Sequence, residues 1–265
     1  MTAYKLRTTP KKVPLIKTKY RTIKTMMPSP SWVRLMKELK KYEGRALYGG
    51  QLPIAWDRAE DFQVYDPDGN KWIDFTSTIF LSNAGHSYPV IIRSIEKQLK
   101  KHLLASYNYP TEIRAKFLKE LTRMAGSFAE KALLFSAGTE ATECAVPLMR
   151  LHGRTKSNKK IAVITFRGNM HGVTMGSEIL KGIPQTLKTY AYSDANVYYI
   201  DFPFPWEDKY KNHNWRKHFH EDMETLRKNG LKFENICGFM IESFRGWAAS
   251  FFPKEYIQEL AKFAR

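Results

Sequence analysis

An apolar run, a turn of small residues and a helical pattern follow one another at residues 131–146, and they constrain the fold of this chain most. Residues 131–135 are Lys-Ala-Leu-Leu-Phe, residues 136–139 are Ser-Ala-Gly-Thr, and the helical pattern starts at Glu140. A strand–turn–helix unit of this kind directs free backbone N–H groups and the positive end of the helix toward one point. The sequence therefore predicts a phosphate site at 136–139, although this turn alone also fits a plain strand-to-helix connection.

Short apolar runs alternate with helical patterns along the second half of the chain. In the first part of the chain we predict a helix at 31–40 capped by Ser31 and a turn at 66–70 between strands at 63–65 and 71–75. Further helices are predicted at 90–99, 111–124, 140–151, 214–227 and from 254. Further strands are predicted at 133–135, 161–166, 196–200 and 236–242. Alternation of strands with helices is typical of an α/β fold. We therefore expect a mostly parallel sheet flanked by helices.

Pro147 conflicts with the helix that follows the small-residue turn. Proline lacks a backbone N–H and costs about 3 kcal/mol in a regular helix interior. Two alternatives stay open from the sequence: the helix is kinked at Pro147, or Pro147 falls in its first turns.

The chain is strongly basic, with a formal net charge of +17 from 43 Lys and Arg against 26 Asp and Glu in 265 residues. Such a charge attracts nucleic acid and membrane surfaces. Because no nucleic-acid motif and no membrane-spanning apolar run is present, we expect neither partner and interpret the charge as a basic face. A basic protein that binds nucleic acid through residues 4–24 is the alternative. Residues 1–30 contain four prolines and no acid, which favours an extended arm over a mitochondrial presequence.

The two cysteines, Cys144 and Cys237, lie in apolar stretches, outside any CxxC or Cys/His cluster. We therefore predict neither a disulfide scaffold nor a metal site. Isolated cysteines fit a reducing compartment, and the first residues lack the apolar core of a secretory signal. We expect a cytoplasmic location.

Motifs of several other enzyme classes are absent from the sequence. There is no GxxxxGK[ST] phosphate loop, and the turn at 136–139 has one glycine where a dinucleotide fingerprint has three. No HExxH or GxSxG motif occurs either. The phosphate predicted at 136–139 therefore belongs to a different kind of ligand.

A series of segments matches, in order, the motifs of one family. The segments are Asp-Pro-Asp-Gly-Asn-Lys-Trp-Ile-Asp at 66–74, Gly-His-Ser-Tyr-Pro at 85–89, Ala-Gly-Thr-Glu-Ala-Thr-Glu at 137–143, Met-His-Gly at 170–172 and Glu-Ser-Phe-Arg-Gly at 242–246. From about Trp56 to its last residue the chain resembles the class III pyridoxal-phosphate aminotransferases, which belong to fold type I. The resemblance implies a basic arm with a small-domain helix and hairpin at 1–75, and the N-terminal part of the large cofactor-binding domain at 76–265.

The resemblance also assigns residues to the binding of pyridoxal 5'-phosphate. Backbone N–H groups of Gly138 and Thr139 would hold its phosphate, with the Thr139 hydroxyl as a further donor, and Ala137 stands where the family has serine. Met170 stands where an aromatic side chain usually stacks on the pyridine ring, and a thioether can pack on such a ring as well. The other residues expected beside the cofactor are His171, Gly172 and Glu242.

Substrate-side positions are implied in the same way. Ile79 and Phe80 fall where the family often has substrate-side aromatic residues. Arg245 and Trp247, at the last motif, would shape the substrate entrance. From the residues alone, core positions are slightly favoured for the first pair, and an exposed turn is an equal alternative for the second pair.

The family's reaction needs two further groups: a lysine that forms a Schiff base with the cofactor, and an aspartate that pairs with the pyridinium nitrogen. The aspartate belongs to an Asp-Glu-x-Gln strand, which this sequence does not contain, and no lysine lies in a motif that marks the Schiff-base residue. We therefore expect no catalytic residue in this chain. We interpret it as the N-terminal portion of a longer enzyme, inactive and poorly soluble by itself.

For the complete enzyme, the resemblance implies a homodimeric transaminase that moves an amino group from an amino acid or terminal amine to a 2-oxoacid. An aminomutase of the same family is one alternative. A non-catalytic, truncated paralogue that binds the cofactor or pairs with a full-length partner is another.

Overall fold

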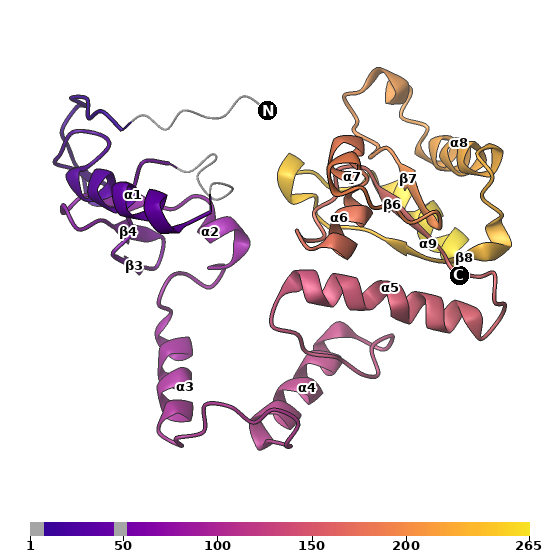
Figure 1. The fold of residues 1–265 in the computed structure, drawn as a ribbon, viewed down its shortest axis with the longest axis horizontal. Coiled ribbons are helices and arrows are strands. Elements are labelled where there is room, and N and C mark those ends of the chain that lie inside the picture. The colour runs from indigo at the N-terminus through magenta and orange to yellow at the C-terminus, as the bar shows by residue number, and fades with distance from the viewer. Residues whose placement is uncertain (1–7, 45–51) are drawn as a thin grey trace. The chain divides into compact units, whose positions relative to one another are not determined.

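The computed structural model describes residues 8–44 and 52–265, and the chain divides into two compact units, residues 1–112 and 113–265 (Figure 1). The first unit contains an antiparallel sheet and the second a parallel one. The boundary predicted after residue 75 separates the small-domain segment from the large domain that the family resemblance implies, and it stays a prediction. The first seven residues of the predicted basic arm lie outside the described residues.

Five antiparallel strands form the sheet of the first unit. In spatial order they are β1 (Ile16–Lys17), β2 (Thr22–Ile23), β5 (Lys71–Ile73), β4 (Gln63–Tyr65) and β3 (Arg58–Glu60). The turn predicted at 66–70 joins β4 to β5 and is confirmed. Asp66 Oδ1 accepts hydrogen bonds from the N–H groups of Asp68 and Asn70 at 3.0 and 2.8 Å, and Gly69 takes a φ of +80°, which glycine adopts at little cost.

Helix α1 (Pro30–Tyr42) packs Trp32 and Met36 against Ala55 in a small apolar cluster. The prediction of Ser31 as its cap is wrong, because the helix begins at Pro30 with Ser29 at the N-cap position. Proline suits a first helical position since its φ is already helical and its missing N–H is not needed there. The N–H of Ser31 instead donates to Asp68 Oδ2 at 2.9 Å.

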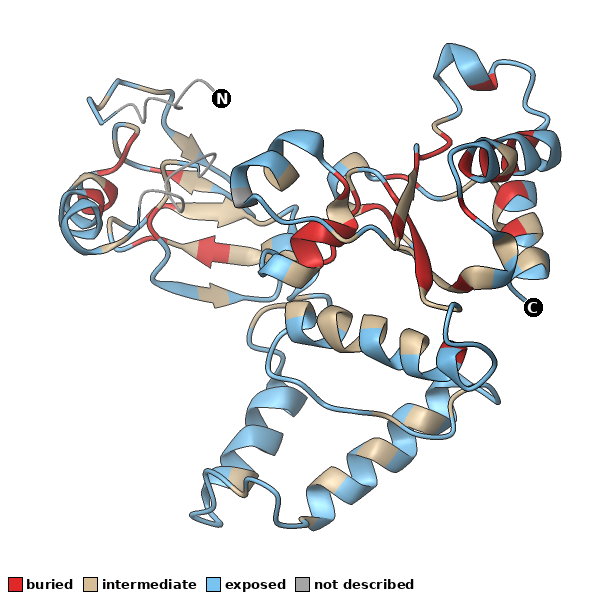
Figure 2. Cartoon of the chain, turned by 45° about the vertical axis from the view of Figure 1, so that its right-hand side comes forward, coloured by how far each residue is buried: buried red, intermediate tan, exposed pale blue. Residues whose placement is uncertain are grey.

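Helices α3 (Pro89–Leu99) and α4 (Glu112–Ala125) form where the sequence predicts helices, but neither contains a buried residue (Figure 2). Their exposed apolar side chains are those of Val90, Ile91, Ile92, Ile95, Leu99, Ile113, Phe117, Leu121 and Met124. Within the described part of the chain, nothing buries the apolar stripe of either helix.

Three parallel strands form the sheet of the second unit, in the order β7 (Val197–Ile200), β6 (Ala162–Phe166) and β8 (Ile236–Met240). All five residues of the central strand β6 are buried. A continuous apolar run is the pattern of a strand covered on both faces, so the α/β fold with a parallel sheet is confirmed.

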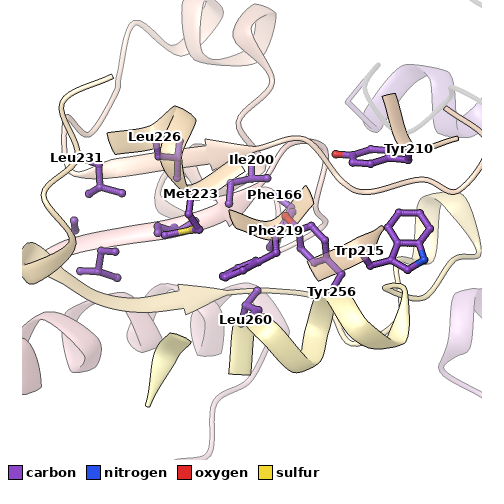
Figure 3. Packing of buried hydrophobic residues seen from close by; sticks show 13 residues of the cluster. Phe166, Ile200, Tyr210, Trp215, Phe219, Met223, Leu226, Leu231, Tyr256 and Leu260 are labelled. Atoms are coloured by element: carbon purple, nitrogen blue, oxygen red, sulfur yellow. The ribbon is translucent and has the colours of Figure 1, made fainter. Parts of the chain in front are cut away.

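Each face of this sheet is covered by helices. The helices of the second unit, besides α4, are α5 (Gly138–Arg154), α6 (Met175–Lys181), α7 (Pro184–Tyr190), α8 (Trp215–Lys228) and α9 (Lys254–Ala264). Ile164 and Phe166 of β6 pack with α8 and α9, through residues such as Phe219 and Tyr256 (Figure 3). Val163 packs on the opposite face with residues of α5 and α6. Side chains of β6 therefore alternate between the two faces, as the period of a strand requires.

The strand predicted at 133–135 is wrong. Residues 131–135 adopt no regular secondary structure, and Leu133, Leu134 and Phe135 are 64%, 48% and 45% exposed. A strand exists only through hydrogen bonds to a neighbour, and no described segment pairs with this run. Its apolar character alone does not produce a strand.

Helix α5 continues through Pro147, which is an interior residue of a 17-residue helix. The alternative that placed Pro147 in the first turns is therefore wrong. Because proline has no N–H, the carbonyl of Glu143, four residues earlier, loses its usual helical donor.

Candidate functional site

Helix α5 presents two unpaired backbone donors at its start. It begins at Gly138, with Ala137 in extended conformation at the N-cap position. Glu140 Oε2 accepts hydrogen bonds from the N–H groups of Ser136 and Ala137 at 3.0 and 3.3 Å. Among the described residues no acceptor faces the N–H groups of Gly138 and Thr139. These are the two groups that the sequence assigns to a phosphate, and they lie at the positive end of the helix.

Space is open beside the first of these donors. A side-chain carbon built on Gly138 would meet no atom within 4 Å, and the residue is exposed. An anion can therefore reach the start of α5 without displacing protein atoms.

The Thr139 hydroxyl belongs to a cluster of three hydroxyls that joins α5 to α6. Its Oγ1 lies 2.7 Å from both Thr174 Oγ1 and Ser177 Oγ. Thr174 precedes α6, and Ser177 lies in its first turn. Each hydroxyl has one proton and two lone pairs, so the Thr139 hydroxyl is held in place and keeps capacity for a further partner.

Glu143 completes this contact between the helices. Its Oε1 accepts hydrogen bonds from the Thr174 hydroxyl and from the N–H groups of Gly176 and Ser177, the last two at 2.8 and 3.3 Å. The carboxylate thus caps the start of α6. These bonds, that from Thr174 first, lower the pKa of Glu143 and keep it charged. Neither Glu143 nor its partners were expected from the sequence, because no local pattern marks a hydrogen bond across 31 residues.

The loop after β6 carries His171, which is buried at 5% exposure. Burial lowers its pKa to about 4, so the imidazole is neutral at pH 7. Its Nε2 lies 3.3 Å from the side-chain amide of Asn169, so the ring edge contacts the residue two positions earlier in the same loop. The backbone carbonyl of His171 accepts a 2.5 Å hydrogen bond from Thr142 of α5.

Gly172 brings this loop against the start of α5. Its φ is +134°, and a side-chain carbon built on it would lie 2.1 Å from Thr139 Oγ1 and 2.6 Å from Ser177 Oγ. Only glycine fits both the backbone conformation and the space. The structure therefore places the Met-His-Gly segment in contact with the turn at 136–139.

Glu242, two residues beyond β8, reaches the same loop. Its Oε2 accepts a hydrogen bond from Met170 N at 3.0 Å. The side chain of Met170 is 36% exposed. Hydrogen bonds and close contacts thus connect the start of α5 with the loops after β6 and β8. These segments carry the seven residues expected beside the cofactor, which are Ala137, Gly138, Thr139, Met170, His171, Gly172 and Glu242.

The two residues expected at the substrate entrance beyond Glu242 differ in how far their side chains are exposed. Trp247 is 75% exposed, and its substrate-side role stays a prediction. Arg245 is only 7% exposed, and its Nη2 donates to the backbone carbonyl of Arg167 at 2.5 Å. The guanidinium therefore points into the protein and not toward solvent.

Ile79 and Phe80 lie in a left-handed turn, α2 (Ser77–Phe80), of the first unit. Four consecutive non-glycine residues have φ between 47° and 69° there, a conformation that costs about 1–2 kcal/mol per residue. Asp74 Oδ2 holds the turn by accepting from Thr78 N at 3.0 Å and lies 2.8 Å from His86 Nε2. Ile79 and Phe80 are 73% and 52% exposed, so the core alternative for them is wrong.

Other kinds of site find no support in the described residues. No helix in them has the length and apolar character needed to cross a membrane. No cluster of three or more His, Cys, Asp or Glu side chains there could hold a metal ion. Cys144 and Cys237 are free thiols.

Curated relatives match the chain along about four fifths of its length. It is 33% identical over 221 residues to ornithine aminotransferase 2 of Staphylococcus saprophyticus, covering 80% of this chain and 50% of the relative. It is 28% identical over 212 residues to ornithine aminotransferase of Saccharomyces cerevisiae, covering 77% of this chain and 47% of the relative. The chain thus spans about half the length of the relatives it matches.

Solved structures share the fold. An omega-transaminase from Thermomicrobium roseum superposes with a TM-score of 0.75 at 16% identity, over 86% of this chain and 53% of that one. The PMP-bound form of an aminotransferase from Vibrio fluvialis superposes with a TM-score of 0.68 at 18% identity, over 86% and 50% of the two chains. The family model for class-III aminotransferases matches residues 46–265. With that match over most of its length, the chain belongs to the class III aminotransferases.

Proposed function

We propose that this chain forms the phosphate-binding part of the cofactor site of a transaminase. In the complete enzyme this site would serve the transfer of an amino group from an amino acid or terminal amine to a 2-oxoacid. The observation that carries the proposal is the pair of unpaired N–H groups of Gly138 and Thr139 at the start of a 17-residue helix, with open space beside Gly138. Backbone donors at a helix start are a general anion site.

Class III aminotransferases depend on pyridoxal phosphate, and the residues present fit its phosphate end. Gly138 and Thr139 would hold the phosphate, while Met170 and the His171–Gly172 segment would flank the ring. When bound, the cofactor supplies an aldehyde that takes up the amino group and a ring that accepts electrons from the substrate carbon.

The protein's own groups supply position and charge. Thr139 is held by hydroxyls at the start of α6, so its backbone N–H keeps a constant direction. His171 stays neutral at pH 7, because burial lowers its pKa to about 4, and it adds no positive charge beside the ring. Glu242 fixes Met170 through the backbone N–H.

We further propose that the complete enzyme is a homodimer located in the cytoplasm. The exposed apolar stripes of α3 and α4 support an interface, since surfaces of this kind mark protein contacts. Two free cysteines support a reducing compartment. Light scattering of the complete enzyme tests the dimer, and a monomer at micromolar concentration would refute it.

The phosphate site is tested by the pair Gly138→Pro and Gly138→Ala in the 265-residue chain. Proline at the first helical position is compatible with the helix and replaces the N–H with a ring carbon, and the extended Ala137 before it already has the conformation that a proline requires. Alanine keeps the N–H and meets no atom. The two variants therefore keep the helix start and differ in the backbone donor that faces the phosphate, with a ring carbon in its place in the proline variant.

Binding of pyridoxamine 5'-phosphate is followed by its fluorescence anisotropy and by ³¹P resonance shifts. A charge-assisted hydrogen bond contributes about 1.5–3 kcal/mol, so Gly138→Pro is expected to weaken binding roughly tenfold or more, whereas Gly138→Ala binds like the unchanged chain. Equal binding by both variants, or competition by pyridoxamine as strong as by inorganic phosphate, would contradict the proposal.

A further inference from the structure

Arg245 is a buried cation at the carboxyl end of the parallel sheet. It follows β8 and is 7% exposed. Its Nη2 donates to the carbonyl of Arg167, the residue that directly follows β6. Its guanidinium carbon lies 4.8 Å from the ring centre of Phe202 and 5.1 Å from that of Phe204, both just beyond β7. One side chain therefore contacts the segments that leave all three strands.

The neighbouring backbone is shaped around this side chain. Gly168, next to the carbonyl that Arg245 binds, has φ +75°, and a side-chain carbon built on it would lie 2.3 Å from Arg245 Nη2. The backbone of Arg245 is itself fixed, since its N–H donates to the carbonyl of Ser250 at 2.8 Å. The guanidinium thus fits a space that only glycine at 168 leaves open.

The same turn contacts the loop after β6 a second time. Glu242, three residues before Arg245, accepts from Met170 N, while Arg245 donates to Arg167 O. The two bonds hold the loop at both ends of the segment 167–170. His171 and Gly172 follow at once and contact α5 through Thr142 and Thr139.

We propose that Arg245 is a positioning residue that fixes the loop at 167–172 and thereby holds His171 and Gly172 against the start of α5. Its importance for the cofactor rests on the proposed function above, but the ordering of the loop does not. Arginine suits this role better than lysine, because its planar guanidinium stacks on aromatic rings while donating in its own plane.

The burial of this charge is consistent with a structural need for it. Arg245 Nη1 is buried and has no partner among the described residues, which is costly for a cation. Burial lowers the pKa of the Arg245 guanidinium, and the carboxylates of Glu242 and Glu207 oppose this by favouring its charged form. A side chain needed only for packing would not require a charge here.

The test uses Arg245→Met and Arg245→Lys in the 265-residue chain, with Arg227→Met as the control. Methionine keeps much of the apolar stem without a donor, whereas lysine keeps the charge and one donor group. Arg227 pairs with Glu224 on the exposed side of α8, so its removal leaves the sheet edge unchanged. Amide hydrogen exchange of the peptide covering 167–172 is measured by mass spectrometry, and near-UV circular dichroism reports Trp206, which stacks on Phe204.

We expect exchange in 167–172 to be roughly tenfold faster in Arg245→Met, with a changed near-UV signal, and Arg245→Lys to restore part of the protection. Arg227→Met should match the unchanged chain. Unaltered exchange in a folded Arg245→Met variant would overturn the proposal. If Arg245→Met does not fold, the other two proteins provide the test. Full protection of residues 167–172 in Arg245→Lys would overturn the proposal. An unprotected Met170 amide in the unchanged chain would overturn it as well.

The two proposals fail in different ways. If Gly138→Pro binds pyridoxamine 5'-phosphate as tightly as Gly138→Ala, the proposed function fails while the exchange result stands. If binding depends on Gly138 but exchange does not depend on Arg245, only the positioning role fails.

Discussion

The second unit packs two clusters of apolar side chains against the faces of its sheet, whereas the described residues of the first unit combine one small apolar cluster with carboxylates that hold its turns. In the second unit Phe166 and Phe219 are completely buried. In the first unit Asp66 and Asp74 each accept several hydrogen bonds from turn residues. Apolar burial stabilises regardless of pH, while carboxylates contribute only when ionised. The two units should therefore respond differently to mutation, whereas acid should act on the turns of the first unit and, in the second, on the cap that Glu143 forms at the start of α6.

The largest expected difference in stability is between a substitution on a helix that packs on the sheet and one on a helix whose apolar stripe is exposed. Phe219→Ala on α8 removes a fully buried ring and should cost about 3–5 kcal/mol of unfolding free energy. Phe117→Ala on α4 removes a side chain that is 50% exposed and should cost at most about 1 kcal/mol. Urea unfolding followed by tryptophan fluorescence measures both. A comparable loss from Phe117→Ala would mean that α4 is covered in solution.

A smaller effect is expected where the loop after β6 meets α5. Gly172→Ala forces a side-chain carbon into Thr139 Oγ1 at a φ of +134°. Strain and overpacking together should cost about 2–3 kcal/mol and weaken phosphate binding. Gly138→Ala, where space is open, serves as the control in the same unfolding and binding measurements. Equal behaviour of the two alanine variants would show that the contact between Gly172 and Thr139 is not kept in solution.

The smallest effect is pH-dependent and belongs to the first unit. Burial alone would raise the pKa of Asp74, but the hydrogen bonds that its carboxylate accepts outweigh burial and lower the pKa from 3.8 to about 2. A lowered pKa contributes stability above the unfolded value, and this is lost as pH falls from about 4 to about 2. The contribution is about 2 kcal/mol at pH 7.

Asp74→Asn should remove this contribution at pH 7 and flatten the acid dependence of the first unit, as measured by thermal unfolding between pH 2 and pH 7. Asp57→Asn, at an exposed position, should leave the pH dependence unchanged. A variant at Asp74 that still loses the same stability in acid would refute the assignment to this carboxylate.

The strands of the second unit were predictable because each is a continuous apolar run bounded by polar residues. The runs predicted at 161–166, 196–200 and 236–242 correspond to β6, β7 and β8 within a few residues. The run at 133–135 has the same character and forms no strand, since no described segment pairs with it. Hydrophobicity in a short run thus predicts a strand only if a neighbour exists.

The candidate site was predictable in its motifs but not in the contacts that support it. Gly138, Thr139 and Glu242 lie in short patterns with a chemical meaning. The hydrogen bonds from Thr174 to Glu143 and from Arg245 to Arg167 span 31 and 78 residues, and no sequence period marks such pairs. Arginine side chains are moreover rarely buried, so the residue type alone predicts an exposed position for Arg245.

By itself, the amino-acid sequence determined the small-residue turn before α5, the order of strands and helices, and the match to the class III aminotransferases. These features depend on residues close together in the chain, whose backbone preferences and apolar periods are local. The tertiary structure alone decided which apolar faces are covered, that Glu140 leaves the N–H groups of Gly138 and Thr139 unpaired, and that Arg245 lies buried beneath the loops. Such outcomes depend on partners distant in sequence, because burial and long-range hydrogen bonds exist only once the sheet brings those partners together.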